Sequence, residues 1–248
     1  MSKYIRIVII SLILLGAYPL YKMTCLFFQI HQLKNSYIKI TPSKNGVQYS
    51  ITNKKPKEWI SNPTINSKAS HAIVISEDWN FYNHKGIDPA QIKESILEHF
   101  FFNKRWRGAS TITQQLIKNL FLNSNRTISR KFKELIMALY LERILSKNQI
   151  LELYLNIIEY GDGLYGIKAA SQHYFQKKFQ ELTPKEGAFL AMLLPNPKKY
   201  SLSFRGKQLT PYAKKIIESI LHKLSVTKYI THEEKIEAQK MPFSWEST

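Results

Sequence analysis

Cysteine and acidic residues are both scarce in this sequence. The single cysteine among 248 residues, Cys25, excludes an internal disulfide framework and a cysteine-based zinc site. The seven histidines form no His-Glu-x-x-His pattern, so nothing indicates a protein-bound metal centre. Asp and Glu total 18 against 36 Lys and Arg, which gives a formal net charge of +18. This excess predicts a polyanionic partner, which could be nucleic acid, an anionic membrane surface or a phosphorylated substrate.

Strand signals are rare after Asp88, and the chain has no internal repeat and no low-complexity tract. Helix-start signals are frequent instead, because capping residues repeatedly precede a Gln or Glu by three positions. These segments are Asp88–Gln91, where we expect Gln91 to reach back to the cap, Ser146–Gln149, Thr183–Glu186 and Thr231–Glu234; Thr210-Pro211 adds a cap followed by proline. The sequence therefore predicts a mainly α globular domain over 65–248.

The longest apolar run lies near the N-terminus. Residues 7–21 carry no charge and stand between Arg6 and Lys22. A bilayer requires roughly 20 apolar residues, but apolar character continues to Phe28, and the flanking cations can snorkel toward the headgroups. We therefore predict a single transmembrane helix over 7–30.

Two alternatives to this anchor are a cleaved signal peptide and a lipoprotein anchor at Cys25. Neither is favoured, because the small residues that their cleavage sites require are lacking. The flanking lysines do not decide which side of the membrane residues 1–6 occupy. Residues 31–64 are polar and interrupted by prolines, and predict a linker or stalk with a small hairpin around Asn45-Gly46.

Two adjacent carboxylates, Glu77 and Asp78, follow the apolar run Ala72–Ile75. This run is apolar enough to be buried, so the two acids should lie where a core element meets an opening. Desolvation there can raise the pKa of a carboxyl into the range that suits a general base. The alternative is that both acids cap or salt-bridge a loop.

A helix is expected over residues 110–121, capped by Ser110 or Thr111, with Ile112, Leu116 and Leu120 facing the core. A continuous stripe of hydrogen-bonding residues lies opposite this apolar face: Thr111, Gln114, Gln115 and Lys118. Such a stripe suits sugar hydroxyls and phosphate oxygens. It could equally be an ordinary solvated helix face.

A basic segment follows, with Arg126, Arg130 and Lys131 close to Glu134. The helix expected here has an apolar face that contains Ile128, Phe132, Leu135, Ile136 and Leu139. Glu134 lies one turn from Lys131, as either an ion pair worth about 0.2–0.5 kcal/mol or a catalytic carboxylate in a basic pocket. In the next helix, Glu152 and Asn156 lie among aliphatic residues, so we interpret them as structural and expect them to hold the glycine-rich turn 160–166.

Four motifs carry a family resemblance. Glu77-Asp78-x-x-Phe81-x-x-His84-x-Gly86, Gly108-x-Ser110-Thr111-x-Thr113-Gln114-Gln115, Arg130-Lys131-x-x-Glu134 and Ile150-Leu151-Glu152-x-Tyr154-Leu155-Asn156 are similar, in order and spacing, to motifs of the peptidoglycan glycosyltransferases. The segment 190–197 resembles the last hydrophobic motif of that family. The resemblance covers roughly Ile65 to Tyr200 and implies a lysozyme-like multi-helix glycosyltransferase domain behind the N-terminal transmembrane helix.

Bifunctional members of this family carry a transpeptidase domain after the glycosyltransferase. About fifty residues follow the matched region here, and they contain no Lys-Thr-Gly. The chain is therefore expected to resemble the monofunctional biosynthetic transglycosylases.

The resemblance implies that the substrates are lipid II and a glycan linked to undecaprenyl diphosphate, joined with inversion. Glu77 would be the base that deprotonates the acceptor 4-hydroxyl, and Lys118, Arg126, Arg130 and Lys131 would neutralise the departing diphosphate. Glu134, also expected to be catalytic, would orient these cations or assist departure. The remaining substrate-binding residues would be Asp78, Phe81, His84, Ser110, Thr111, Gln114, Gln115 and Asn119. No cofactor is required, although Mg²⁺ or Mn²⁺ could accompany the diphosphate.

Because lipid II is polymerised outside the cytoplasmic membrane, residues 1–6 should be cytoplasmic and the domain periplasmic or extracellular. Phe100–Phe102 and Trp106 either seat the domain among lipid headgroups or form an ordinary buried helix end. Other cell-wall proteins are candidate partners. Nucleic acid is not expected, because no recognition motif appears. The rival functions are a lysozyme-like glycan hydrolase and a non-catalytic membrane scaffold that binds lipid II.

Overall fold

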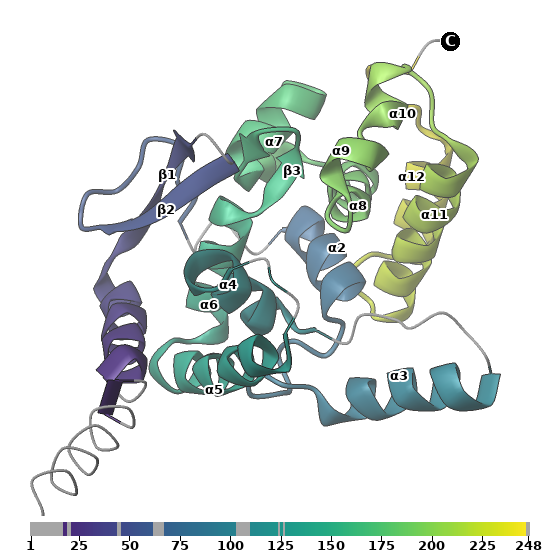
Figure 1. Ribbon diagram of the computed structural model, residues 1–248. Helices are drawn as coiled ribbons and strands as arrows, with labels where there is room; N and C mark the ends of the chain where they lie inside the picture. The colour runs from purple at the N-terminus through teal and green to yellow at the C-terminus, as the bar shows by residue number, and fades with distance from the viewer. Residues whose placement is uncertain are drawn as a thin grey trace, which may run out of the picture.

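The computed structural model describes residues 17–18, 21–43, 46–61, 67–102, 110–123, 125 and 127–246, without the side chains of 96 and 98–102. This part of the chain is mainly helical, as the sequence predicted (Figure 1). Its helices are 21–32, α2 (Lys68–Glu77), α3 (Pro89–Phe102), α4 (Ile112–Phe121), α5 (Ile128–Ile144), α6 (Lys147–Ile157), α7 (Ile167–Phe175), α8 (Pro184–Leu193), α9 (Pro197–Tyr200), α10 (Leu202–Arg205), α11 (Pro211–Val226) and α12 (His232–Lys240), with 3-10 turns at Leu33–Asn35 and Phe179–Glu181. Its strands are β1 (Tyr37–Ser43), β2 (Gly46–Thr52), β3 (Glu159–Gly161) and β4 (Leu164–Tyr165).

The centre of the domain is the contact between α2 and α8 (Figure 1). Most residues of both helices are buried, as expected of helices inside a core. Gly187 permits their close approach, because a Cβ atom at this position would lie 2.4 Å from Cα of Ala69. Helix α2 is therefore held between neighbours along its length, and it ends at Glu77.

The predicted helix starts are largely confirmed. Capping boxes form at Ser146, Thr183 and Thr231, and the Thr210 side chain caps α11. The expectation for Gln91 was wrong: its buried Oε1 atom has no hydrogen-bond partner within the described ranges.

Asp88 caps α3 on its own. Its Oδ1 atom accepts hydrogen bonds from the backbone amides of Ala90 and Gln91 at 3.0 and 3.1 Å.

The predicted hairpin is confirmed as β1 and β2, which pair in antiparallel register with Ser43 opposite Gly46. The chain that follows the hairpin packs on α6. Asn156 donates to the carbonyl of Ile60 and accepts from its amide, both at 2.8 Å, while Glu152 accepts from the Trp59 indole at 2.6 Å. Asn156 and Glu152 are structural, as interpreted, but they hold this incoming segment rather than the glycine-rich turn.

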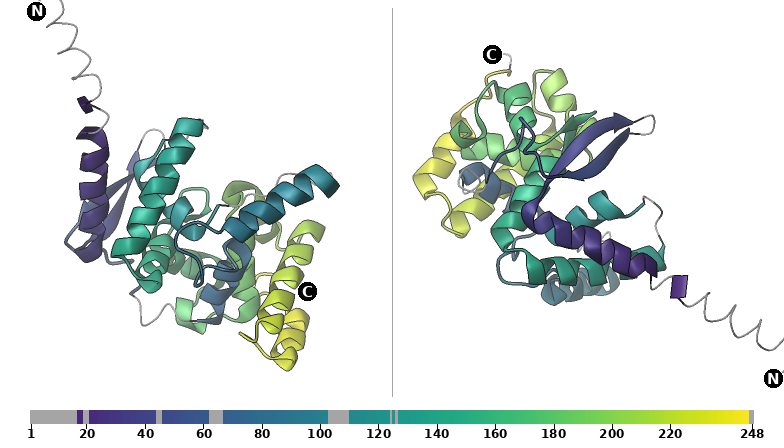
Figure 2. Two further views of the ribbon diagram at one scale, coloured as in Figure 1. Left: turned by 90° about the horizontal axis from the view of Figure 1, so that it is seen from below. Right: turned by 90° about the vertical axis from the view of Figure 1, so that its left-hand side faces the viewer.

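The N-terminal helix 21–32 lies along α5 in both views of Figure 2, and the ring centroids of Phe27 and Tyr140 are 4.8 Å apart. Within the described ranges, no helix is both long and apolar enough to cross a membrane. Half of the predicted transmembrane segment 7–30, and all of the tail 1–6, lies outside those ranges.

The orientation of α5 differs from the sequence-based expectation. Its apolar face is exposed, with 91% of Ile128 and 63% of Phe132 accessible. The buried face instead contains Met137, Leu141 and the polar residue Glu134. The apolar pattern identified a helix correctly but not its orientation, and the inward Glu134 is paired with Arg130 and Lys131.

Candidate functional site

Glu77 is the last residue of α2 and lies at the edge of the core. Its Oε2 atom accepts a hydrogen bond of 3.0 Å from the Gln115 side-chain amide. Burial raises the pKa of the Glu77 carboxyl, and the charge of Asp78 raises it further, while Gln115 and the Lys118 charge oppose the rise. A raised pKa makes a carboxylate a stronger proton acceptor, which suits a general base.

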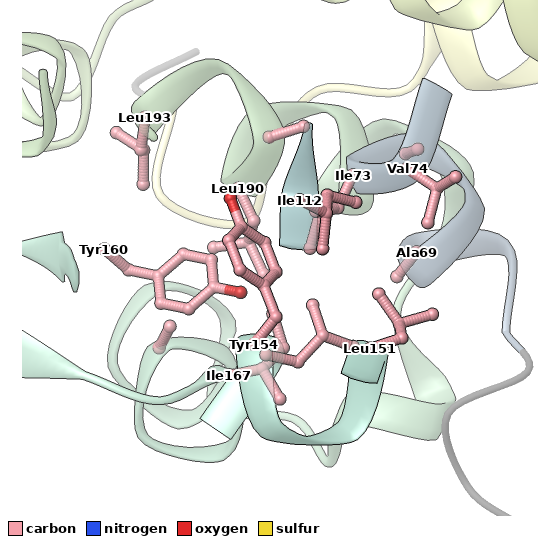
Figure 3. Close-up of a cluster of buried hydrophobic side chains, with 14 of the residues drawn as sticks. Ala69, Ile73, Val74, Ile112, Leu151, Tyr154, Tyr160, Ile167, Leu190 and Leu193 are labelled. Atoms are coloured by element: carbon pink, nitrogen blue, oxygen red, sulfur yellow. The ribbon is translucent and has the colours of Figure 1, made fainter. Parts of the chain in front are cut away.

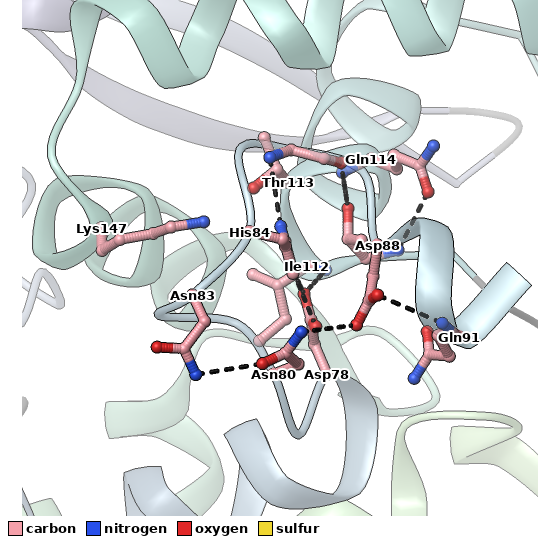
Figure 4. Close-up of polar contacts among 12 residues, drawn as sticks. Asp78, Asn80, Asn83, His84, Asp88, Gln91, Ile112, Thr113, Gln114 and Lys147 are labelled. Carbon is pink, nitrogen blue, oxygen red and sulfur yellow. Dashed lines mark hydrogen bonds and ion pairs between the residues drawn. The ribbon is translucent and has the colours of Figure 1, made fainter.

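Asp78 is fully buried and joins three segments (Figure 4). Its carboxylate contacts His84 Nε2 at 2.9 and 3.0 Å and accepts from the backbone amide of Ile112 at 2.9 Å. His84 Nδ1 accepts from the Gly86 amide at 3.1 Å, so the histidine donates to Asp78 through Nε2. Asp78 therefore links the end of α2 to the first turn of α4, where a negative charge also complements the helix dipole.

Phe81 is fully buried in the same region, and Lys147 Nζ lies 4.4 Å from its ring centroid. The sequence proposed Asp78, Phe81 and His84 as substrate-binding residues. The structure places all three inside the protein, where they support the backbone between Glu77 and α4.

The predicted polar stripe on α4 divides into two parts. Thr111 and Gln114 are buried and form the capping box that starts the helix, and Thr111 also donates to the Gly86 carbonyl at 2.7 Å. Gln115 and Lys118 lie nearer the surface and face the carboxylates. Thr111 and Gln114 thus form the start of the helix, and Gln115 and Lys118 are the two members that can act in the site.

Glu134 is the second carboxylate of the site, with 3% of its side chain exposed. It accepts a 2.7 Å hydrogen bond from Arg130 Nη1 and pairs with the Lys131 ammonium, which also donates to Ser110 Oγ at 3.0 Å. Arg130 Nε donates to the Asn125 carbonyl at 2.7 Å. Glu134 therefore fixes two cations at the surface while it is itself buried.

Lys118 connects the two carboxylates electrostatically. Burial lowers the pKa of its ammonium, and the charges of Arg130 and Lys131 lower it further, while Glu134 and Glu77 oppose this. Among the described residues, Lys118 has no hydrogen bond or salt bridge. Its charge is thus available to an anionic ligand that approaches between Glu77 and Glu134.

Three predicted positions remain outside this geometry. Asn119 is half-buried on α4 beside Lys118, while Arg126 and the motif residue Gly108 lie outside the described ranges. The described residues contain no group of three or more His, Cys, Asp or Glu that could hold a metal ion. A cavity of about 970 Å³ lies between Phe27, the loop 82–85 and the second half of α5, and neither Glu77 nor Glu134 lines it.

Tyr154 is a member of the site that the sequence reasoning named in a motif but gave no role. Its hydroxyl, in the core, donates to Gln115 Oε1 at 3.0 Å. The sequence could have indicated this contact through a tyrosine at a core position of α6, because the hydroxyl of a buried tyrosine usually has a hydrogen-bond partner.

Comparison with known proteins places these residues inside one matched region. The family model described as Transglycosylase matches residues 44–224. The chain is 38% identical over 162 residues to a biosynthetic peptidoglycan transglycosylase of Nitrosomonas eutropha, covering 65% of this chain and 66% of that protein. It is 43% identical over 150 residues to a protein of the same description from Alcanivorax borkumensis, covering 60% of each chain.

A longer relative matches over the same region. Penicillin-binding protein 1A of Aquifex aeolicus is 37% identical over 199 residues, which cover 80% of this chain and 27% of that protein. The chain thus spans less than two thirds of the length of each of these relatives.

Proposed function

The chain belongs to the transglycosylase family, and from this premise and the site geometry we propose that it polymerises peptidoglycan glycan strands. The observation that carries the proposal is that the site contains both a candidate base and a group of cations. Glu77 is a half-buried carboxyl whose pKa burial raises, and it lies near Lys118, while Arg130 and Lys131 pair with Glu134. A transfer that expels a diphosphate needs both a base and a group of cations.

The proposed donor is a glycan linked to undecaprenyl diphosphate, and the acceptor is lipid II. Glu77 takes the proton of the acceptor GlcNAc 4-hydroxyl while its oxygen bonds to the donor C1 carbon. The bond from C1 to the diphosphate oxygen breaks on the opposite side, and its electron pair leaves with the diphosphate. Attack and departure on opposite faces convert an α linkage into a β linkage.

The cations stabilise the negative charge of the departing diphosphate. Lys118 has no partner among the described residues, so it is assigned to the diphosphate directly, and Arg126 is assigned there by resemblance. Arg130 and Lys131 are held in place by Glu134, which acts by orienting them. Mg²⁺ or Mn²⁺ accompanying the diphosphate would come with the substrate, and the described residues offer it no carboxylate cluster.

The substrate places the domain at a membrane. We assign the segment 7–30 to a single transmembrane helix, with 1–6 in the cytoplasm and the domain outside. The exposed Ile128 and Phe132 on α5 support a place for the domain at the membrane, because they flank Arg130 and Lys131 on the same helix and could enter the headgroup region.

The experiment gives the purified full chain fluorescent lipid II and, separately, preformed glycan strands, and resolves the products on a gel. We expect a ladder of polymer from lipid II that a muramidase digests, and no shortening of the preformed strands. Shortening of those strands would identify a hydrolase. Binding of lipid II by the folded protein without any polymer would identify a scaffold, and either result contradicts the proposal.

A further inference from the structure

We propose that Tyr154 is a positioning residue for Glu77, acting through the side-chain amide of Gln115. This inference rests on the proposed function, in which Glu77 is the base. Tyr154 lies on α6, Gln115 on α4 and Glu77 at the end of α2, so the interaction joins three helices.

Two hydrogen bonds form the connection. The Tyr154 hydroxyl donates to Gln115 Oε1, and Gln115 Nε2 donates to Glu77 Oε2, each at 3.0 Å. Tyr154 is fully buried, and Figure 3 shows its ring in the core cluster with Ile73 and Leu190. The phenol is therefore rigid, whereas the amide of Gln115 is the part that could rotate.

The direction of these bonds favours an ionised Glu77. A carboxylate only accepts hydrogen bonds, so it requires the NH₂ group of Gln115. That orientation turns Oε1 toward Tyr154, where the phenol donates to it. If the amide were reversed, the described residues would leave the phenol proton without an acceptor. Each bond in such a chain also polarises the next.

Tyr160 provides a matched comparison. It is another fully buried tyrosine, it lies beside Tyr154 in Figure 3, and the charge of Glu77 reaches both phenols. The Tyr160 hydroxyl, however, has no hydrogen-bond partner among the described residues. Tyr→Phe at these two positions therefore makes the same chemical change with and without the connection to Gln115.

The consequence is a pH effect with a definite sign. Burial raises the pKa of Glu77, and the Gln115 hydrogen bond lowers it. Lys118 and Asp78 are the charged groups near the Glu77 carboxyl, and Tyr154→Phe changes neither of them. Loss of the phenol should weaken the Gln115 bond, raise the pKa of Glu77 further and leave less of the base ionised at acid pH.

The test is the pH profile of kcat/KM for lipid II polymerisation by the full chain, in wild type, Tyr154→Phe and Tyr160→Phe. We expect the acid limb of Tyr154→Phe to move up by about half a pH unit, as expected for loss of one indirect hydrogen bond. Activity below the limb should fall about threefold, with little change on the plateau. Tyr160→Phe should reproduce the wild-type profile.

A second variant keeps the hydroxyl and guards against misfolding. Replacement of Tyr154 by 3-fluorotyrosine makes the phenol a stronger donor, so the acid limb should move to lower pH, while the same replacement of Tyr160 should have no effect. In a Gln115→Leu background, Tyr154→Phe should cause no additional shift. Acid limbs that coincide with wild type in both Tyr154 variants would overturn the inference.

Glu77→Gln separates this inference from the proposed function. If that variant is inactive while the Tyr154 variants keep the wild-type limb, the positioning role is wrong and the function stands. If Glu77→Gln polymerises lipid II at the wild-type rate, Glu77 is not the base, and the proposed mechanism and the inference fail together.

Discussion

The Asp78 carboxylate accepts a hydrogen bond of 2.9 Å from the backbone amide of Ile112, which fixes the end of α2 against the start of α4. Glu77 stands on one side of this junction and Gln115 on the other, and the two side chains meet at 3.0 Å. The position of the proposed base therefore depends on a buried carboxylate next to it. The predictions below test this junction and the groups around it.

Asp78→Asn removes a charge that is fully buried and hydrogen-bonded to His84 and Ile112. We expect the free energy of unfolding to fall by about 2–3 kcal/mol, because one buried donor loses its acceptor. Urea denaturation followed by circular dichroism measures this. Asp162→Asn is the control, since Asp162 is exposed and pairs with Lys198 at 2.5 Å, and its loss should change stability by less than about 1 kcal/mol. Equal effects of the two variants would contradict the role of Asp78 in holding this junction.

Glu77→Gln should stabilise the protein near neutral pH. Because burial raises the pKa of Glu77 when the chain folds, the folded state binds the proton more tightly than the unfolded state. Stability therefore declines as the pH rises from the unfolded pKa through the folded one, and the neutral amide avoids this decline. Unfolding curves should show the variant more stable at pH 7.5 and equal to wild type below the ordinary carboxyl pKa of 4.5. A variant that is less stable at both pH values would show that folding does not disfavour the negative charge of Glu77.

Lys118→Met removes a cation that lies near Glu77 and Glu134 and forms no hydrogen bond or salt bridge among the described residues. We expect kcat/KM for lipid II to fall about 100-fold or more, because a charge-assisted contact to the departing diphosphate is lost. Lys133→Met is the control, because Lys133 is an exposed lysine of α5. Stability should be nearly unchanged in both variants. If Lys118→Met keeps the activity of Lys133→Met, Lys118 does not bind the diphosphate.

Gly187→Ala tests the packing that holds the base in place. The added methyl would lie 2.4 Å from Cα of Ala69, so α2 and α8 must separate, which typically costs about 1–3 kcal/mol. Gly206→Ala is the control, because its nearest contact would be the Leu202 carbonyl at 3.3 Å. Thermal unfolding compares the two, and equal melting temperatures would mean that the helix contact tolerates the methyl.

Much of this fold could be predicted from local patterns. Capping residues such as Thr183 and Thr231 mark helix starts because their side chains satisfy backbone amides a few residues away. The apolar run before Glu77 correctly indicated a buried element with a carboxylate at its end. These features depend on residues that are close together in the sequence, so they can be predicted from it.

The rest depends on contacts between distant segments. The apolar residues of α5 predicted a helix, but its buried face contains Glu134, which pairs with Arg130 and Lys131, and Phe132 is exposed. The hydrogen bond from Tyr154 to Gln115 joins residues 39 positions apart, and no periodic pattern in the sequence indicates it. The attachment of Asn156 to Ile60, 96 positions away, was missed for the same reason.

The most direct test of the account is the rate at which the full-length Glu77→Gln protein polymerises fluorescent lipid II. We expect the variant to fold and to bind lipid II as wild type does, and to lose about 10²–10⁴-fold in polymerisation rate, the usual contribution of a general base. Polymerisation within a few-fold of the wild-type rate would contradict the assignment of Glu77 as the base, and with it the mechanism proposed for this site.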